Sequence, residues 1–271
     1  RTVLNDYPHA VAIGEVWVYD NEQFARYLRA DELHLGFNFR LLRADFDASE
    51  IRGAVENSLA AAAIENATPT WTLSNHDVER DVTRYGGGEV GLARAWAMAL
   101  VMLALPGAVF IYNGEERGLA NVDLPDEALR DPVWERSGHT RRGRDGSRVP
   151  MPWEGDAPPF GFSANPDTWL PLPQEWSSLT VEKQLADPES TLSLYREAIR
   201  LRSSRSEFGG SAVEWLDSPD DTLVYRVVGG GLVCALNAGS KPVALPAGEV
   251  LLASAELVDG QLPPNAAAWL V

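Results

Sequence analysis

The chain has 271 residues, with 23 lysines and arginines against 39 aspartates and glutamates, which gives a formal net charge of −16. That length allows one large domain or two smaller ones, and it suffices to bury a substantial core. The acidic balance argues against a nucleic-acid-binding surface. The longest apolar run, near residues 95–105, is too short to span a membrane. The single cysteine, Cys234, excludes an internal disulfide and favours a reducing compartment, so a cytoplasmic location is expected.

The first part of the chain alternates strand-like and helical segments. Short apolar strands are predicted at residues 11–14, 33–39, 69–74 and 108–112. Helices are predicted at 21–30, from Asp47 to about 64, and at 89–105, where Asp47 and Glu50 form a capping-box pattern for the second helix. This alternation implies parallel strands with crossover helices, and therefore four strand–helix units of an α/β fold.

Two later regions differ in character. Residues 113–187 hold many prolines, glycines, aspartates and tryptophans with little periodicity, and so long a loop in a compact domain is usually functional. A helix is predicted to start at Asp187-Pro188-Glu189, with an N-cap followed by proline at the first helical position. From about residue 207, short apolar runs separated by turns predict a small all-β domain over 207–271, with strands at 222–228, 232–236, 243–245, 250–253 and 267–271.

Two carboxylates occupy matching places after predicted strands. Glu15 follows the first strand and Asp77 the third. In a β/α barrel, residues just past the strand C-termini face a shared active-site mouth. A pair of acids flanking a glycosidic bond performs glycoside hydrolysis, since one protonates the leaving oxygen and the other stabilises positive charge on the sugar. The alternative is that each acid merely caps a helix or pairs with an arginine.

Other polar residues carry weaker signals. His76 beside Asp77 is expected to donate a hydrogen bond to a substrate hydroxyl, or else to act as a structural donor. The charged series at 79–84 is consistent with a solvated helix start, and residues 143–146 with a plain turn. The four histidines are scattered, no cysteine supports them, and no glycine-rich phosphate loop follows a strand, so neither a metal nor a cofactor is predicted.

Four segments, taken together, point to a family. They are Gly-Glu-Val-Trp at 14–17, Ser-Asn-His-Asp at 74–77, Ile-Tyr-Asn-Gly-Glu-Glu-Arg-Gly at 111–118 and Gly-Arg-Asp-Gly-Ser-Arg-Val-Pro-Met-Pro-Trp at 143–153. The chain resembles the α-amylase superfamily of glycosidases (glycoside hydrolase family 13), in its α-glucosidase and oligo-1,6-glucosidase branch. In that family the segments hold, in this order, the acid/base glutamate, the transition-state-stabilising aspartate, the residues after the eighth barrel strand and a loop characteristic of the branch.

The resemblance implies a role for each candidate residue. Glu15 is expected to be the general acid/base, with the neighbouring Trp17 helping to exclude water. Asp77 is expected to stay ionised and to bind hydroxyls of the terminal glucose, and His76 to hydrogen-bond the same sugar. Arg144 resembles a residue that recognises the non-reducing-end glucose. The substrate is accordingly expected to be an oligosaccharide.

Two residues depart from the family pattern. Asn113 and Arg117 stand where the family usually has Gln and Leu, and little effect on the chemistry is expected.

A larger departure is the absence of the family's nucleophile. That residue is an aspartate after the fourth strand, upstream of the acid/base, and no counterpart precedes Glu15. The resemblance therefore implies the C-terminal half, strands five to eight, of a (β/α)8 TIM barrel over residues 1–206, followed by a β-sandwich domain. The intact enzyme is expected to be a retaining α-glucosidase acting at non-reducing ends, and this chain alone to be inactive, because no glycosyl intermediate can form without the nucleophile.

Strand edges point to a partner, and two other functions stay open. The strands at 11–14 and 108–112 are expected to be free edges, which favour association with the N-terminal half of the barrel or with a second copy of the chain. One alternative function is a glucosyl-transferring or isomerising member of the same family. The other is a non-catalytic partner or structural fragment.

Overall fold

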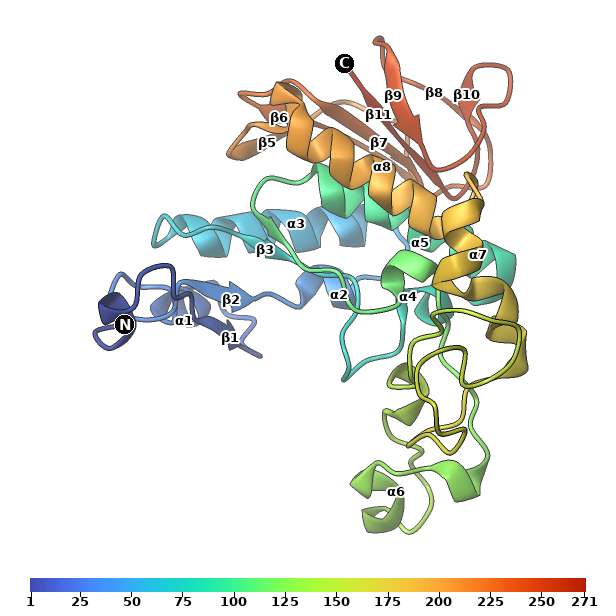
Figure 1. Cartoon of the computed structure of the whole chain (residues 1–271). Coiled ribbons are helices and arrows are strands. Elements are labelled where there is room, and N and C mark those ends of the chain that lie inside the picture. Colours follow the sequence, from blue (N-terminus) through green and yellow to red (C-terminus); the bar gives the residue numbers. More distant parts are fainter. The chain divides into compact units, whose positions relative to one another are not determined.

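The computed structural model, drawn in Figure 1, describes all residues from 1 to 271. These residues divide into two compact units. The first unit consists of residues 1–73, 97–110 and 200–271, and the second of residues 74–96 and 111–199. The two boundaries at 96/97 and 199/200 fall inside helices α5 (Gly88–Ala104) and α8 (Thr191–Ser204). None of the helices combines the length and the apolar character that crossing a membrane requires.

Two pairs of short parallel strands lie in the first unit. Strand β1 (Ile13–Glu15) pairs with β2 (Leu35–Phe37), and β3 (Thr70–Trp71) pairs with β4 (Ala108–Val109). The Thr70 hydroxyl links the two pairs, because it donates to the Gly36 carbonyl at 2.6 Å and accepts from the Asn38 amide at 3.2 Å. Each strand is shorter than its predicted segment, but the parallel pairing agrees with the alternation in the sequence.

Helices α1 (Asn21–Arg26), α2 (Arg40–Arg43) and α3 (Ala48–Ala63) accompany these strands. Asp47 caps α3 as predicted: its Oδ1 accepts from the amides of Ser49 and Glu50 at 2.9 and 3.0 Å. The capping box is not closed at Asp47, because the Glu50 carboxylate instead accepts from the Asp45 amide at 3.0 Å. Short 3-10 turns occur at Leu4–Asp6 and Ser206–Phe208.

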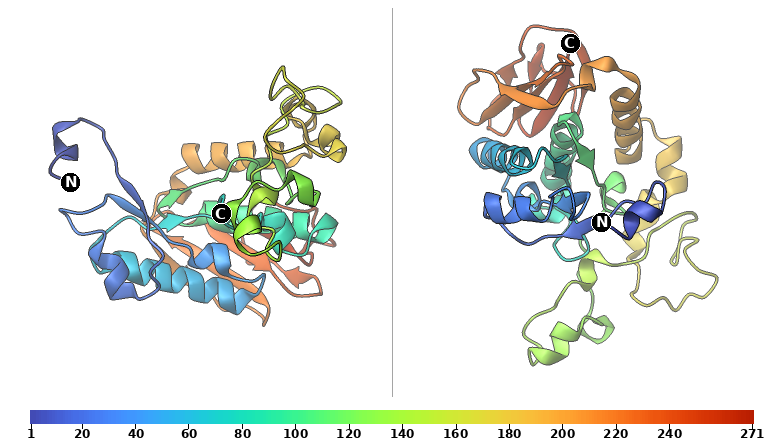
Figure 2. Two further views of the ribbon diagram at one scale, coloured as in Figure 1. Left: turned by 90° about the horizontal axis from the view of Figure 1, so that it is seen from below. Right: turned by 90° about the vertical axis from the view of Figure 1, so that its left-hand side faces the viewer.

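An antiparallel sheet forms the C-terminal part of the first unit (Figure 2). Its five strands, in the spatial order β5-β6-β7-β11-β9, are β5 (Ala212–Trp215), β6 (Thr222–Val228), β7 (Val233–Asn237), β11 (Ala266–Leu270) and β9 (Val250–Ala253). A separate two-stranded ladder joins β8 (Val243–Ala244) to β10 (Gln261–Leu262). The sheet is tied to the later turns of α5, since Trp269 Nε1 donates to the Leu100 carbonyl at 3.0 Å and the Tyr225 hydroxyl to the Val101 carbonyl at 2.6 Å.

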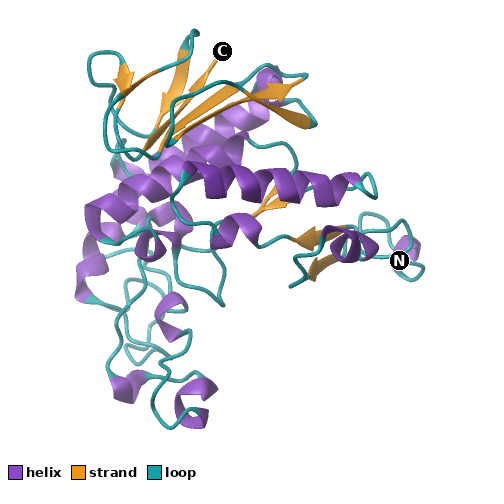
Figure 3. Cartoon of the chain, turned by 180° about the vertical axis from the view of Figure 1, so that it is seen from behind, coloured by secondary structure: helices purple, strands orange, loops and turns teal.

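The second unit is mostly loop with short helices (Figure 3). It contains α4 (Asp81–Arg84), α6 (Pro132–Arg136), α7 (Val181–Ala186) and 3-10 turns at Glu115–Arg117, Asp126–Ala128, Asp145–Ser147 and Gln174–Leu179. These segments share a core of buried apolar side chains: Leu119, Leu124, Leu129, Val149, Met151, Phe160, Leu170, Leu172 and Trp176. The non-periodic stretch at 113–187 is therefore an ordered, separately packed region.

The start of α8 differs from the prediction. The helix begins at Thr191, not at Pro188. The Ser193 amide donates to the Ser190 hydroxyl at 3.2 Å, and the Leu192 amide donates to Gln184 Oε1 at 3.0 Å. The carboxylate of Asp187, the predicted N-cap, accepts from the Glu189 amide at 2.9 Å, which lies before the helix. Serine at the cap and a glutamine from α7 thus satisfy the first helical amides, and they place the helix start three residues later.

Candidate active site

Glu15 is the last residue of β1, at the carboxyl end of a parallel strand, and its side chain is exposed. Its Oε1 accepts a hydrogen bond from Trp17 Nε1 at 2.6 Å. Trp17 stacks on Phe39 with ring centroids 4.1 Å apart, and the Arg43 guanidinium lies 5.0 Å above the Trp17 ring. The indole is itself 39% exposed, so it orients Glu15 through this hydrogen bond more than it shields the acid from water.

His76 and Asp77 lie in the second unit, on the loop that follows β3. The Asp77 amide donates to Asn75 Oδ1 at 2.8 Å, which folds the loop into an Asx turn. The His76 side chain is 59% exposed, and its Nε2 lies 3.6 Å from Asp77 Oδ1. Because Glu15 and Asp77 belong to different units, the common cleft for the two acids stays a prediction.

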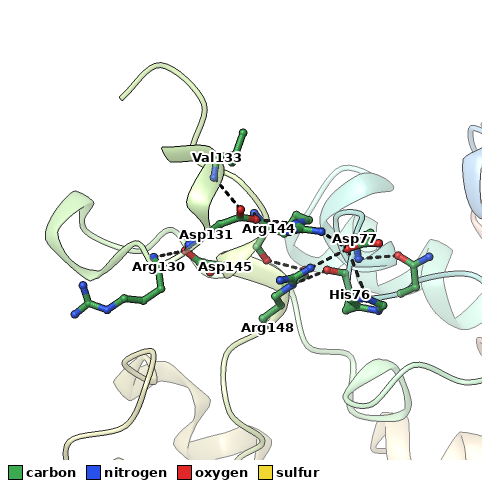
Figure 4. A network of polar contacts seen from close by, with 10 residues as sticks. His76, Asp77, Arg130, Asp131, Val133, Arg144, Asp145 and Arg148 are labelled. Carbon is green, nitrogen blue, oxygen red and sulfur yellow. Dashed lines mark hydrogen bonds and ion pairs between the residues drawn. The ribbon is translucent and has the colours of Figure 1, made fainter. Parts of the chain in front are cut away.

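Two arginines converge on Asp77 (Figure 4). Asp77 Oδ1 accepts from Arg144 Nη1 at 2.7 Å and from Arg148 Nη2 at 2.8 Å, and Arg148 Nε donates to the His76 carbonyl at 2.8 Å. Partial burial opposes ionisation of Asp77, but the Arg144 hydrogen bond and the charges of His76, Arg144 and Arg148 outweigh it and lower its pKa. The carboxylate is therefore held ionised, and both arginines contact the same oxygen, Oδ1.

Two buried carboxylates fix the loop that carries Arg144, and one of them, Asp131, contacts Arg144 directly. Asp131 is buried, and its Oδ2 accepts from Arg144 Nε at 2.7 Å and from the Arg144 amide at 3.1 Å. The Arg144 hydrogen bond lowers the pKa of Asp131 to about 2, although burial by itself would raise it. Asp145, also buried, accepts from the amides of Arg130 and Asp131 at 2.5 and 2.7 Å. The loop over residues 130–148 is thus built around two buried aspartates, whose oxygens accept hydrogen bonds from amides of the same loop.

Arg80 joins the motif segments to one another. It is only 3% exposed, and its guanidinium donates to the carbonyls of Asn113 and Ser147 at 2.9 and 3.0 Å. The guanidinium lies 4.9 Å above the Tyr112 ring, whose hydroxyl also donates to the Ser147 carbonyl. The interpretation of residues 79–84 as a solvated helix start is wrong for Arg80 and Asp81, because both are buried. Arg80 instead links two of the family-like segments, 111–118 and 143–153.

Glu115 lies in a buried cluster behind the same loop. Its Oε2 accepts from the Ser74 hydroxyl at 2.6 Å, and its Oε1 accepts from the Tyr195 hydroxyl at 3.0 Å. Burial, together with the nearby charge of Asp81, raises the pKa of Glu115 to about 8. Glu115 therefore carries a proton at neutral pH and anchors the first residue of the Ser74–Asp77 loop.

Arg117, which stands where the family usually has Leu, is fully buried. Its Nη1 donates to the Pro152 carbonyl at 3.2 Å, and burial lowers its pKa to about 10. The Arg117 carbonyl accepts from Gln184 Nε2 at 2.9 Å, so this residue links the 111–118 segment to α7.

A cavity of about 630 Å³ opens beside Asp77 within the second unit. Its lining includes Asp77, Asp131, Val133, Arg136, Arg141 and Arg144. The aspartate and the arginine predicted to contact sugar thus face one cavity.

Sequence reasoning missed two residues of this cluster. Arg148 lies inside the 143–153 motif, five residues before its tryptophan, but only the folded loop shows that its guanidinium returns to His76 and Asp77. Asp131 caps α6, accepting from the Val133 amide at 3.0 Å, with Pro132 at the first helical position. Asp-Pro is a helix-start signal that could have been found, but the bond to Arg144 could not.

Comparison with known proteins identifies the family. Residues 1–209 match the sequence profile described as alpha amylase, catalytic domain. The chain belongs to the α-amylase family. A probable α-glucosidase of Rhizobium meliloti (strain 1021) is 34% identical over 230 residues, which cover 83% of this chain and 41% of that relative. The oligo-1,6-glucosidase of Heyndrickxia coagulans is 30% identical over 263 residues, which cover 83% of this chain and 46% of that protein. These similarities place the chain in the α-glucosidase branch of the family.

A solved structure supports the same family fold. The α-glucosyl transfer enzyme XgtA is 33% identical and superposes with a TM-score of 0.83, covering 100% of this α-amylase-family chain and 52% of the enzyme. The chain therefore has part of an α-amylase-type barrel fold, and it spans about half the length of the relatives that it matches.

Proposed function

We propose that this chain is the C-terminal half of a retaining α-glucosidase, carrying barrel strands five to eight and the β domain that follows. The observation that carries the proposal is the convergence of Asp77, His76 and Arg144 in one cluster, from two family-like segments that lie far apart in the sequence. The intact enzyme would hydrolyse α-glucosidic bonds at the non-reducing ends of oligosaccharides.

The chemistry divides between the two halves of the barrel. An aspartate of the N-terminal half attacks the anomeric carbon, while Glu15 gives its proton to the leaving glycosidic oxygen. Water then attacks the anomeric carbon of the glycosyl–enzyme ester, and Glu15 takes a proton from that water. Glucose leaves with its configuration retained, the nucleophilic aspartate returns as a carboxylate, and Glu15 is again protonated for the next cycle. Asp77 stays ionised throughout, because the charges of Arg144 and Arg148 favour its carboxylate form, and it stabilises the positive charge that develops on the sugar.

The partner of this chain is proposed to be the N-terminal half of the barrel. Strand β1 pairs only with β2, and β4 pairs only with β3. Val11, two residues before β1, is 58% exposed, and Ile13, the first residue of β1, is 40% exposed. Apolar side chains beside unpaired strand edges favour a protein partner over water.

The test compares the 271-residue chain with the intact protein on a chromogenic α-glucoside. The intact protein should turn over, and both Glu15→Gln and Asp77→Asn should lower its turnover about 10²–10³-fold or more, whereas the 271-residue chain alone should show none. Robust turnover by the chain alone, lost in Glu15→Gln, would mean that a carboxylate within these residues serves as the nucleophile.

Glucosyl transfer is the second candidate function. It is favoured by the likeness to XgtA, a glucosyl transfer enzyme that covers the whole chain at 33% identity. Product analysis of the intact protein on sucrose, maltose and isomaltose separates the two reactions. Free glucose in step with each bond cleaved supports hydrolysis, and new disaccharides or trisaccharides support transfer.

A further inference from the structure

We propose that Asp131 is a positioning residue that holds the Arg144 guanidinium in hydrogen-bonding distance of Asp77. Its catalytic meaning rests on the function proposed above, but its geometry does not. Arg144 is 43% exposed, and a long exposed side chain on a loop would otherwise sample many rotamers.

The contacts of Asp131 fix both the main chain and the side chain of Arg144. One carboxylate oxygen, Oδ2, accepts from the Arg144 amide and from Nε, which leaves Nη1 directed at Asp77. The other oxygen, Oδ1, accepts from the Val133 amide and completes the cap of α6. Both oxygens of a side chain that is only 2% exposed are thus engaged, so the carboxylate has one orientation.

The backbone around this pair is shaped to bring the two residues together. Gly143 has a φ of +78°, and a Cβ built on it would lie 2.7 Å from the Asp131 Cβ. Only glycine permits this approach without displacing Asp131. In addition, the Asp145 carboxylate accepts from the Asp131 amide at 2.7 Å and so fixes the position of the Asp131 backbone. The loop therefore constrains Asp131 from both directions, as expected for a residue whose orientation matters.

The experiment uses the 271-residue chain and nuclear magnetic resonance of labelled arginine and aspartate side chains. In Asp131→Asn, exchange of the Arg144 Nε proton should quicken about tenfold or more, since its charged acceptor is lost. The pKa of Asp77 should rise by about 0.5 or more, because Arg144 no longer points at it. The control is Asp126→Asn, which removes one of the two exposed carboxylate partners of Arg142 from the same unit and should change neither signal.

Unchanged Arg144 exchange and unchanged Asp77 titration in folded Asp131→Asn would overturn the proposal. If that variant does not fold, Arg144→Ala tests the same pair, because it truncates a half-exposed side chain. The pKa of Asp131 should then rise from about 2. An Asp131 titration identical to wild type would refute the coupling.

The intact protein supplies an independent measurement of the catalytic consequence. Asp131→Asn should lower kcat/KM, and it should have no further effect in an Arg144→Ala background, because it acts only through that arginine. Additive losses would overturn the positioning role. Absence of any glucosidase activity would refute the proposed function and leave the resonance result standing, so the two failures are distinguishable.

Discussion

The short loop Ser74–Asp77 joins two polar clusters that shift the pKa of a carboxyl group in opposite directions. At its start, Ser74 donates to Glu115, which burial keeps protonated at neutral pH. At its end, Asp77 is partly exposed and held ionised by Arg144, Arg148 and His76. Ser74 and Asp77 are three residues apart. Ser74 contacts Glu115, an acid that is stabilised in its neutral form, whereas Asp77 is itself stabilised as an anion.

One loop can therefore be fixed at its start by a buried acid and present a charged carboxylate at its end. A neutral buried acid can hold Ser74 and Tyr195 without an uncompensated interior charge. An anion at the cavity, in turn, needs cations beside it, because partial burial alone would favour protonation. Pairs of acids whose environments separate their pKa values often mark acid and base assignments. Of Glu115 and Asp77, however, only Asp77 lines the cavity.

The largest expected effect is a difference in catalytic activity between substitutions of Asp77 and of Glu115. In the intact protein, Asp77→Asn should lower kcat about 10²–10³-fold or more, because it removes charge that stabilises the transition state. Glu115→Gln should retain most of the activity, since it preserves the size and the neutral state of a side chain outside the cavity. Steady-state rates on a chromogenic α-glucoside check this. Equal losses in the two variants would contradict the division of roles.

The next effect is on stability and concerns the buried acid. Glu115→Ala in the 271-residue chain should lower the free energy of unfolding by about 2–4 kcal/mol, because it leaves a cavity and removes the partner of the buried Tyr195 hydroxyl. Denaturant unfolding measures the change. Glu127→Ala, at an exposed position of the same unit, is the control and should stay within about 0.5 kcal/mol of wild type.

The pH dependence of the free energy of unfolding tests whether Glu115 is protonated in the folded chain. The folded-state pKa of Glu115, about 8, lies above its ordinary value of 4.5, so folded chains hold a proton that unfolded chains release between these values. The stability from this group is fully present below pH 4.5 and is lost as the pH rises towards 8. Glu115→Gln does not titrate, and it should reduce the loss of stability between pH 5 and pH 8 by about 1 kcal/mol or more. Parallel curves for the variant and wild type would show that Glu115 is ionised when folded.

The smallest expected effect concerns Arg148. Arg148→Ala should raise the pKa of Asp77 towards its ordinary value, because one of the two guanidinium groups on Oδ1 is lost. The unfolding free energy should change by less than about 1 kcal/mol, since the ion pair is partly exposed to water. Carboxyl resonances followed against pH measure the first effect. An unchanged Asp77 titration would leave Arg144 as the arginine that keeps Asp77 ionised.

Some elements could be predicted because their signals are local. The Asp47 cap, α5 and strands β6 and β9 follow from residues within one or two turns of each element. Strand β5 and the two-residue β10 were not predicted, because short strands are stabilised by their neighbours in the sheet and carry little pattern of their own. The start of α8 was misplaced because Gln184, from another helix, supplies an acceptor to its first turn.

The family-like segments, their order, and the residue types at 15, 76, 77 and 144 could be recognised in the sequence, because a motif is a run of neighbouring residues. The partners of those side chains became visible only in the folded chain. Arg148 contacts Asp77 across 71 residues and Ser74 contacts Glu115 across 41. Arg80 and Asp81, which resemble a solvated helix start in the sequence, are buried. Burial and long-range pairing set protonation and orientation, and they depend on how distant segments pack, which no local pattern encodes.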